Sequence, residues 1–252
     1  MQATFLGTGT SHGIPVIGCH CRVCTSGDPR NQRTRCSLLV RAGQANLLID
    51  AATELRLQAV REGLERVDAV LFTHPHADHI GGLDDLRRFN EIQGGPLPCY
   101  ANDFTLREIR QRYGYIFRET QLGGGKPQLD LHEVDGPIPL SDLTVQPVPV
   151  WHGKLPILGY RLGDLAYVTD CSEMPERSLA LLRGVRVLII GALRHRPHPT
   201  HFNIEQALEV VQHLRPERSY LTHICHDLDH EATNAALPAG VELAYDGLTI
   251  EV

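Results

Sequence analysis

The sequence predicts an α/β protein of the α+β kind, in which two sheets pack face to face with helices on their outer sides. Short apolar segments of strand length recur along the whole chain, and single amphipathic helices separate them. No sequence repeat and no interdomain linker interrupts this pattern. A length of 252 residues fits one unit, because folds of this class reach ~250 residues as single domains. We therefore expect residues 1–252 to form a single domain.

The first half of the chain opens with three strands that turns at glycine and asparagine connect into a β-meander. These strands are expected at Ala3–Leu6, Ser37–Arg41 and Asn46–Asp50. A helix is expected at Thr53–Leu64, with Thr53 as its N-cap and an apolar face that includes Leu55 and Val60. The apolar strand Ala69–Thr73 then leads into a histidine-rich loop.

The middle and second half continue the same alternation. A second amphipathic helix is expected at Asp103–Tyr113, and the glycine-rich Gly123–Gly125 segment is expected in a surface loop. Six further strands are expected from apolar runs, at Leu143–Val150, Leu158–Leu162, Ala166–Thr169, Val185–Ile190, Ser219–Thr222 and Val241–Tyr245. Helices are expected at Pro175–Arg183, with its proline in the first turn, and at Asn203–Leu214, with Asn203 as the cap.

The composition excludes several classes of protein and hints at another. With 24 Lys and Arg against 30 Asp and Glu, the net charge is −6, which argues against a sequence-independent grip on nucleic acid. The N-terminus has no signal-peptide pattern, and no apolar run approaches the ~18 residues of a membrane span. We therefore expect a cytoplasmic protein without a membrane partner. The 14 His and 7 Cys are soft ligands for transition metals, and in a reducing compartment clustered cysteines indicate a metal site before a disulfide.

The most specific motif follows the strand Ala69–Thr73 and has the spacing H-x-H-x-D-H. It consists of His74, His76, Asp78 and His79. Residues two apart in an extended segment project to the same side, so the first two histidines can share one cation. The other two residues come where the chain turns toward a helix and can point at a second position. A divalent cation resolves the repulsion within such a cluster.

This motif, with the Ile80–Leu83 segment after it, resembles that of the metallo-β-lactamase superfamily, whose fold is an αββα sandwich of two mixed sheets with a dinuclear metal site at one edge. The resemblance implies three further ligands, each just after an apolar strand: His152, Asp170 and His223. It implies that His74, His76 and His152 hold one metal and that Asp78, His79 and His223 hold the other. In this scheme Asp170 bridges the two metals.

A second candidate metal site lies in a Pro/Gly-rich loop near residues 19–24. Cys19, Cys21 and Cys24 have the spacing C-x-C-x-x-C, which suits tetrahedral zinc with a fourth ligand. Redox use of the cysteines is the alternative. The chain is similar to a subgroup of the superfamily that carries this triad and includes the phosphodiesterases of bacterial phosphonate breakdown. That resemblance implies His226 as the fourth ligand of a structural Zn²⁺, with Cys225 as the competing candidate.

The chemistry expected from this resemblance is hydrolysis of a phosphodiester in a small, cyclic sugar phosphate such as phosphoribosyl cyclic phosphate. A hydroxide shared by two divalent ions, Mn²⁺ or Zn²⁺, would be the nucleophile. His201 aligns with the catalytic histidine of the family and, with Asp78, is expected to take part in catalysis. Arg194 and Arg196 are candidates for holding a distal phosphate of the substrate, because the guanidinium fork matches phosphate oxygens. The relatives also imply a homodimer.

Two other functions remain open within the same fold. A tRNA 3′-end endonuclease uses the same dinuclear site and has an element related to Gly159–Arg161, but the acidic net charge opposes it. The accessory protein of pyrroloquinoline quinone synthesis shares the cysteine site but is degraded in its histidine-rich loop, whereas this chain retains every ligand. Other branches of the superfamily hydrolyse thioesters and lactones. The cysteine triad of this chain argues against these substrates.

Overall fold

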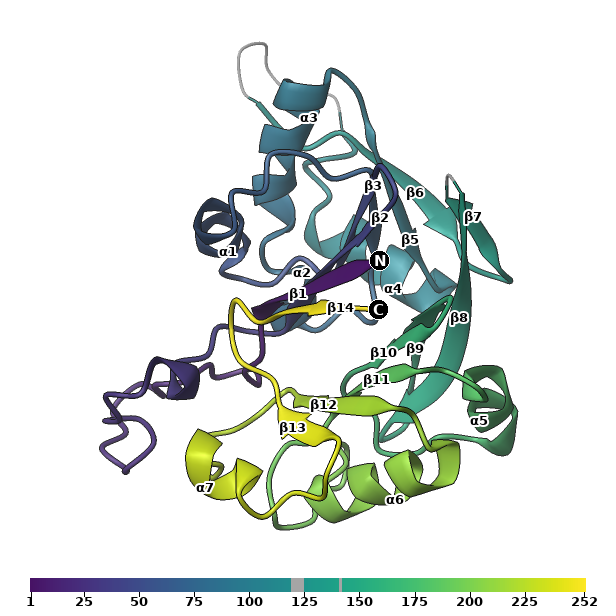
Figure 1. The fold of residues 1–252 in the computed structure, drawn as a ribbon. Coiled ribbons are helices and arrows are strands. Elements are labelled where there is room, and N and C mark those ends of the chain that lie inside the picture. Colours follow the sequence, from purple (N-terminus) through teal and green to yellow (C-terminus); the bar gives the residue numbers. More distant parts are fainter. Residues whose placement is uncertain (119–124, 141) are drawn as a thin grey trace.

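The computed structural model describes residues 1–118, 125–140 and 142–252, and in these residues two sheets of seven strands each lie face to face (Figure 1). The strands of the first sheet are β1 (Gln2–Gly7), β2 (Ser37–Ala42), β3 (Ala45–Ile49), β4 (Ala69–Leu71), β5 (Leu97–Ala101), β6 (Leu129–Glu133) and β14 (Thr249–Glu251). The strands of the second sheet are β7 (Ile138–Leu140), β8 (Leu143–His152), β9 (Leu155–Leu162), β10 (Leu165–Val168), β11 (Val187–Gly191), β12 (Arg218–Thr222) and β13 (Val241–Leu243).

Both sheets are mixed. The first has the order β14-β1-β2-β3-β4-β5-β6, with the expected antiparallel meander at β1, β2 and β3 and parallel pairing from β3 to β6. The second has the order β13-β12-β11-β10-β9-β8-β7, antiparallel from β7 to β10 and parallel from β10 to β13. The loops that follow β4, β10 and β12 carry the histidine-rich motif, Asp170 and His223.

Helices cover the outer faces of both sheets (Figure 1). The helices are α1 (Leu55–Arg61), α2 (Ala77–Ile80), α3 (Arg87–Gln93), α4 (Asp103–Arg112), α5 (Glu176–Leu182), α6 (Ile204–Leu214) and α7 (His230–Asn234), with 3₁₀ turns at Pro29–Asn31 and Leu83–Leu86. The predicted αββα sandwich is thereby confirmed. No helix in these residues is long and apolar enough to cross a membrane.

Three apolar cores hold the layers together. Because side chains alternate along a strand, one strand can contribute residues to two of these cores. In β2, Leu38 and Val40 face the core between the sheets, together with Tyr160 and Tyr167 of the opposite sheet. Leu39, between them, faces the core under the helices of the first sheet. Side chains of successive strand residues point to opposite faces, so a strand buried on both faces reads as a continuous apolar run. The third core lies between the second sheet and its helices.

The helix expected at Thr53–Leu64 is shorter, and two details of it were wrong. It begins at Leu55, and Thr53 is not its N-cap, because the Thr53 hydroxyl donates to the carbonyl of Ala77 at 3.3 Å instead. Val60 is 73% exposed rather than on the buried face. It lies five positions after Leu55, about 140° around the helix, so the two side chains cannot share one face.

The sequence analysis missed the four strands β5, β6, β7 and β14 and the short helices α3 and α7, whereas α2 lies where the chain was expected to turn toward a helix. The strands β7 and β14 have three residues each, and β6 alternates apolar with charged residues at the edge of its sheet. Such segments lack the apolar run that marks a buried strand. By contrast, α6 has the expected Asn203 cap, completed by a reciprocal bond with Gln206. Of the expected glycine-rich loop, Gly123 and Gly124 lie outside the described residues.

Candidate metal centre

The sheet ends bring the separate candidate ligands to one place. His152 is the last residue of β8, Asp170 follows β10 by two positions, and His223 directly follows β12. Asp170 and His223 have φ values of 54° and 58°, in the left-handed region that residues other than glycine rarely adopt. Backbone strain of this kind costs of order 1–3 kcal/mol per residue and clusters at functional sites.

Two sets of donor atoms result. The ring nitrogens of His74, His76 and His152 lie within 4.8 Å of one another, and so do the donors of a second set. The second set consists of Asp78, His79, Asp170 and His223. Asp170 Oδ2 lies 3.1 Å from His223 Nε2 in the second set and 3.9 Å from His74 Nε2 in the first. Asp170 therefore stands between the two sets, as a bridging carboxylate must.

Buried nitrogen atoms in this cluster lack hydrogen-bond partners. These atoms are Nε2 of His74, Nε2 of His79 and both ring nitrogens of His223. Buried polar atoms are nearly always paired, and an unpaired one costs about 1–3 kcal/mol. Neutral imidazole nitrogens beside carboxylates are the donors that divalent transition metals take. The residues present thus fit two divalent cations.

The opposite ring nitrogens are held by protein acceptors, which fixes the side that faces the cluster. His79 Nδ1 donates to Asp50 Oδ2 at 2.6 Å, and His74 Nδ1 donates to the Thr73 hydroxyl at 3.0 Å. His152 Nδ1 donates to the backbone carbonyl of Thr200 at 2.7 Å. With the proton on Nδ1, each Nε2 keeps its lone pair for a cation.

Charge in the cluster is arranged around its carboxylates. Burial alone raises the pKa of Asp170, but its interactions with His223 and His79 outweigh burial and hold this pKa well below its usual range. Burial likewise opposes ionisation of Asp78, and His79 and His223 again hold its pKa far below normal. Both carboxylates are therefore ionised at neutral pH, and a cation between them would neutralise this buried negative charge.

Asp50 is a residue of this centre that the sequence analysis missed. It is fully buried and accepts the backbone N–H and the hydroxyl of Thr73, each at 2.8 Å, besides its bond from His79. A carboxylate behind a ligand histidine orients the ring and raises its basicity. One feature of the sequence could have identified Asp50. It directly follows the apolar run Leu47–Ile49, much as Asp170 follows the apolar strand β10.

We predict that Asp50→Asn weakens metal binding at this centre roughly 10- to 100-fold. Asparagine keeps the shape and tolerates the left-handed backbone at this position, where φ is 63°, but it removes the charge behind His79. Competition with a chelator measures the affinity. Asp246→Asn is the matched control, since Asp246 is also a largely buried carboxylate held by threonines but contacts none of the candidate ligands. Equal affinity in the Asp50 variant and the wild type would contradict the prediction.

The cysteine cluster also assembles around a histidine. Sγ atoms of Cys19, Cys21 and Cys24 lie 3.3, 3.6 and 3.4 Å from His226 Nδ1. The backbone N–H of Val16 donates to Cys24 Sγ at 3.3 Å, as amides do to thiolates. Cys225 stays outside this set, and its sulfur accepts the N–H of Asp227. The donor set S₃N suits tetrahedral zinc, and its geometry favours His226 over Cys225 as the fourth donor.

We predict that Cys21→Ser lowers the bound metal by one equivalent and loosens only the segment near residues 15–30. The base of this segment is held independently by paired backbone bonds between Ile14 and Arg33, at 2.8 Å each. Elemental analysis measures the metal, and amide hydrogen exchange measures the loosening. Cys99→Ser, a buried cysteine in β5, is the control for the metal count. Unchanged metal content in Cys21→Ser would refute zinc binding at this cluster.

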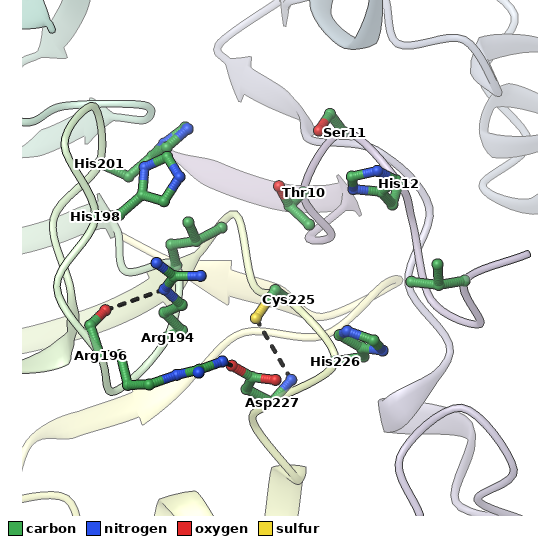
Figure 2. A pocket seen from close by; sticks show the side chains of 12 residues that line it. Thr10, Ser11, His12, Arg194, Arg196, His198, His201, Cys225, His226 and Asp227 are labelled. Carbon is green, nitrogen blue, oxygen red and sulfur yellow. Dashed lines mark hydrogen bonds and ion pairs between the residues drawn. The ribbon is translucent and has the colours of Figure 1, made fainter. Parts of the chain in front are cut away.

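A cavity of about 430 Å³ is lined both by His226 of the cysteine cluster and by His201 (Figure 2). Its lining residues are Thr10, Ser11, His12, Val16, Leu193, Arg194, Arg196, His198, His201, Cys225, His226 and Asp227. His201 is the lining residue nearest the candidate metal centre, with Nδ1 3.7 Å from Asp170 Oδ2. Burial, opposed by Asp170 and reinforced by the neighbouring imidazoles, lowers the pKa of His201 to about 3. His201 also forms a third donor set with His152 and Asp170. Its position therefore allows two roles, transfer of a proton or binding of a metal.

The two arginines of the cavity differ in their contacts. Arg196 pairs with Asp227 at 3.1 Å, which joins two walls of the cavity. Arg194 folds onto its own loop, with Nε donating to the carbonyl of Arg196 at 3.1 Å and Nη2 donating to that of Pro197 at 2.9 Å. Both arginines thus line the cavity, but Arg196 is already paired with the carboxylate of Asp227.

Comparison with known proteins relates this chain to the beta-lactamase superfamily. The model of the beta-lactamase superfamily domain matches residues 45–224. An octanoyltransferase of Porphyromonas gingivalis is 42% identical over 98% of this chain, but the chain spans only 51% of that protein. Coenzyme PQQ synthesis protein B of Methylorubrum populi is 29% identical, covering 75% of this chain and 72% of that protein.

Among solved structures, a diphosphatase from the PhnP family is 45% identical, with a TM-score of 0.93 over 100% of this chain and 97% of the other. Zinc-bound PqqB from Methylobacterium extorquens is 22% identical, with a TM-score of 0.79 over all of both chains. The short form of human tRNase Z is 19% identical, with a TM-score of 0.71 over 100% of this chain and 99% of the other. The last two likenesses concern the fold alone.

Proposed function

The chain belongs to the metallo-β-lactamase superfamily as one of its hydrolases, and from this premise we propose that it cleaves a phosphodiester bond in a small, cyclic sugar phosphate. The observation that carries the proposal is the pair of adjacent donor sets, with Asp170 of the second set 3.9 Å from His74 of the first, beside a cavity lined by arginine and histidine. Divalent cations and cationic side chains together favour an anionic substrate such as a phosphate diester.

Two divalent cations, Mn²⁺ or Zn²⁺, would lower the pKa of a water toward neutrality and polarise a phosphoryl oxygen. The side chains and backbone around the centre would orient the ligands and balance the charge of the cations. Asp50 and the carbonyl of Thr200 orient ligand histidines, and the buried Asp170 and Asp78 hold the negative charge that the cations need. His201 lines the cavity beside the candidate metal centre, so it could reach the leaving oxygen of a substrate bound there.

His201 is neutral at pH 7 by its lowered pKa, so it requires a change in its surroundings to act as an acid. The negative charge of a phosphate beside an imidazole raises the pKa of the imidazole. Substrate binding would therefore draw a proton onto His201, which can then pass it to the leaving alkoxide.

A second candidate reaction is hydrolysis of a diphosphate. A diphosphatase of the PhnP family at 45% identity over the whole chain favours it. The same two-cation arrangement serves an ester and an anhydride, because in both a hydroxide displaces an oxygen from phosphorus in line.

Other activities among the relatives have weaker support. The octanoyl transfer of the Porphyromonas protein belongs to a chain about twice as long as the part matched, and the cavity is lined by charged and imidazole groups beside only two aliphatic side chains, Val16 and Leu193. A tRNA substrate is opposed by the net charge of −6 and a cavity of small-molecule size. A carrier role of the PqqB kind would not need the complete donor sets of this centre.

The proposal is tested with metal-loaded protein and three chromogenic substrates: bis(p-nitrophenyl) phosphate, p-nitrophenyl phosphate and p-nitrophenyl octanoate. We expect turnover of the diester, none or little of the monoester, and none of the acyl ester. Turnover of the acyl ester alone would replace the proposal with an esterase. Separate assays of nucleoside diphosphates and cyclic phosphates then distinguish the two candidate reactions.

A further inference from the structure

The end of α4 holds the backbone of the histidine-rich motif at two points. Arg112 is the last residue of this helix, and its Nη1 donates to the carbonyl of Pro75 at 2.6 Å. Tyr113 is the C-cap, and its hydroxyl donates to the carbonyl of Ile80 at 2.8 Å. We call residues 75–80 the ligand segment, because one helix holds both of its ends. The candidate ligands within it are His76, Asp78 and His79.

Pro75 limits the ways in which the backbone between two ligand histidines can be held. Proline has no N–H, so the carbonyl is the one backbone hydrogen-bonding group that this residue offers. Pro75 is buried, and a buried carbonyl without a partner is destabilising. The guanidinium of Arg112 supplies that partner with a charge-assisted hydrogen bond, which is stronger than a neutral one. Arg112 therefore fixes the backbone between His74 and His76.

Arg112 is itself held in place by α4. Its Nη2 donates to Oε2 of Glu108 at 2.6 Å, and residues four positions apart are neighbours on a helix surface. Because the guanidinium is planar, holding one of its nitrogens also sets the direction of the other. The hydrogen bond to the ligand segment thus comes from a side chain that is oriented in advance.

The other end of α4 is attached beside a third ligand histidine. Asn102, the N-cap of α4, donates from Nδ2 to the carbonyl of Pro156 at 3.0 Å. Pro156 lies in β9 and pairs with Trp151, which directly precedes His152 in β8. The helix therefore connects the hairpin that carries His152 with the loop that carries the other two histidines of the first donor set.

We propose that Arg112 and Tyr113 are positioning residues, which set the geometry of the metal centre by holding the backbone at the two ends of the ligand segment. The inference rests on the proposed function, whose cations this segment would bind. It adds two residues that act through backbone carbonyls rather than through the ligand side chains. A segment released at one end has more conformations, so a cation must order more of the chain when it binds, and its affinity falls.

The test measures Mn²⁺ affinity by competition with a chelator, in the absence of substrate. We expect Arg112→Ala to bind Mn²⁺ roughly 10-fold more weakly than the wild type, as the loss of one charge-assisted hydrogen bond implies. Arg112→Lys keeps a charged donor and should recover part of this loss. Tyr113→Phe removes a single hydroxyl and should weaken binding roughly 2- to 10-fold.

Two further measurements separate positioning from a general loss of stability. The visible absorption spectrum of bound Co²⁺ reports the arrangement of its ligands, and we expect it to change in Arg112→Ala. The melting temperature of every metal-free variant shows whether the protein is folded. Arg107→Ala is the matched control, since Arg107 is on the same helix and pairs with Asp103, also four positions away, at 3.0 Å. It should keep both the affinity and the spectrum of the wild type.

Wild-type Mn²⁺ affinity in both Arg112→Ala and Tyr113→Phe would overturn the proposal, and so would an equal loss of affinity in Arg107→Ala. Metal binding is measured here without catalysis, so the two proposals fail separately. If the variants bind Mn²⁺ more weakly but the metal-loaded wild type hydrolyses no phosphate ester, the proposed function is wrong and the positioning role stands.

Discussion

Asp170→Asn is expected to abolish hydrolysis of bis(p-nitrophenyl) phosphate, with a loss of more than roughly 100-fold. Removing a carboxylate that only orients a ligand histidine costs about 10- to 100-fold in metal affinity or activity. Asp170 contacts both donor sets directly, so the loss on removing its charge should be larger. Asparagine tolerates the left-handed backbone at this position, so the loss reports the charge rather than backbone strain. Steady-state kinetics and elemental analysis of the same sample measure turnover and metal together.

Asp164→Asn is the control for this substitution. Asp164 is an acid of the second sheet near β10, but its side chain is 52% exposed and pairs only loosely with Arg186, at 3.9 Å. We expect wild-type turnover and metal content from it. If Asp170→Asn kept its full metal content and its turnover, the bridging role of Asp170 would be wrong.

His201→Ala is expected to lower turnover roughly 100- to 10,000-fold for a substrate with an alkoxide leaving group, without loss of metal. The loss should be much smaller for bis(p-nitrophenyl) phosphate, because p-nitrophenolate leaves without a proton. This contrast between leaving groups is specific to a general acid. A purely structural role would lower both rates alike.

The same variant decides between the two roles that the geometry allows for His201. Its Nδ1 lies within reach of Asp170 and His152, so a ligand role would show itself as loss of metal. His213→Ala, in the last turn of α6 and outside both donor sets, should change neither rate nor metal content. Equal loss of metal and of both rates in His201→Ala would contradict the assignment as an acid.

The part of the site that the sequence predicted is the part encoded locally. His74, His76, Asp78 and His79 lie within six residues, and their spacing alone indicates a metal. His152, Asp170 and His223 could be identified only through the order of ligands in a known superfamily, because the contacts among them join different strands. No local pattern shows that three strand ends meet.

The residues that were missed act through three-dimensional contacts that the sequence does not reveal. Thr200 uses its backbone carbonyl to orient His152, and any residue has such a carbonyl. Asp50 was overlooked because a single acid after a strand is common, and its role depends on its complete burial beside His79. For the fold, long apolar strands were recognised, whereas edge strands such as β6 were not, since only pairing in the sheet reveals them.

The central claim, that a pair of divalent cations at Asp170 drives phosphodiester hydrolysis, is tested most directly by metal titration. Chelator-treated protein is given Mn²⁺ in increments, and bound metal and bis(p-nitrophenyl) phosphate turnover are measured at each step. We predict that turnover is absent at the start and rises to its maximum as two equivalents bind at this centre. Full turnover before any metal is restored, or no turnover with both equivalents bound, would contradict the claim.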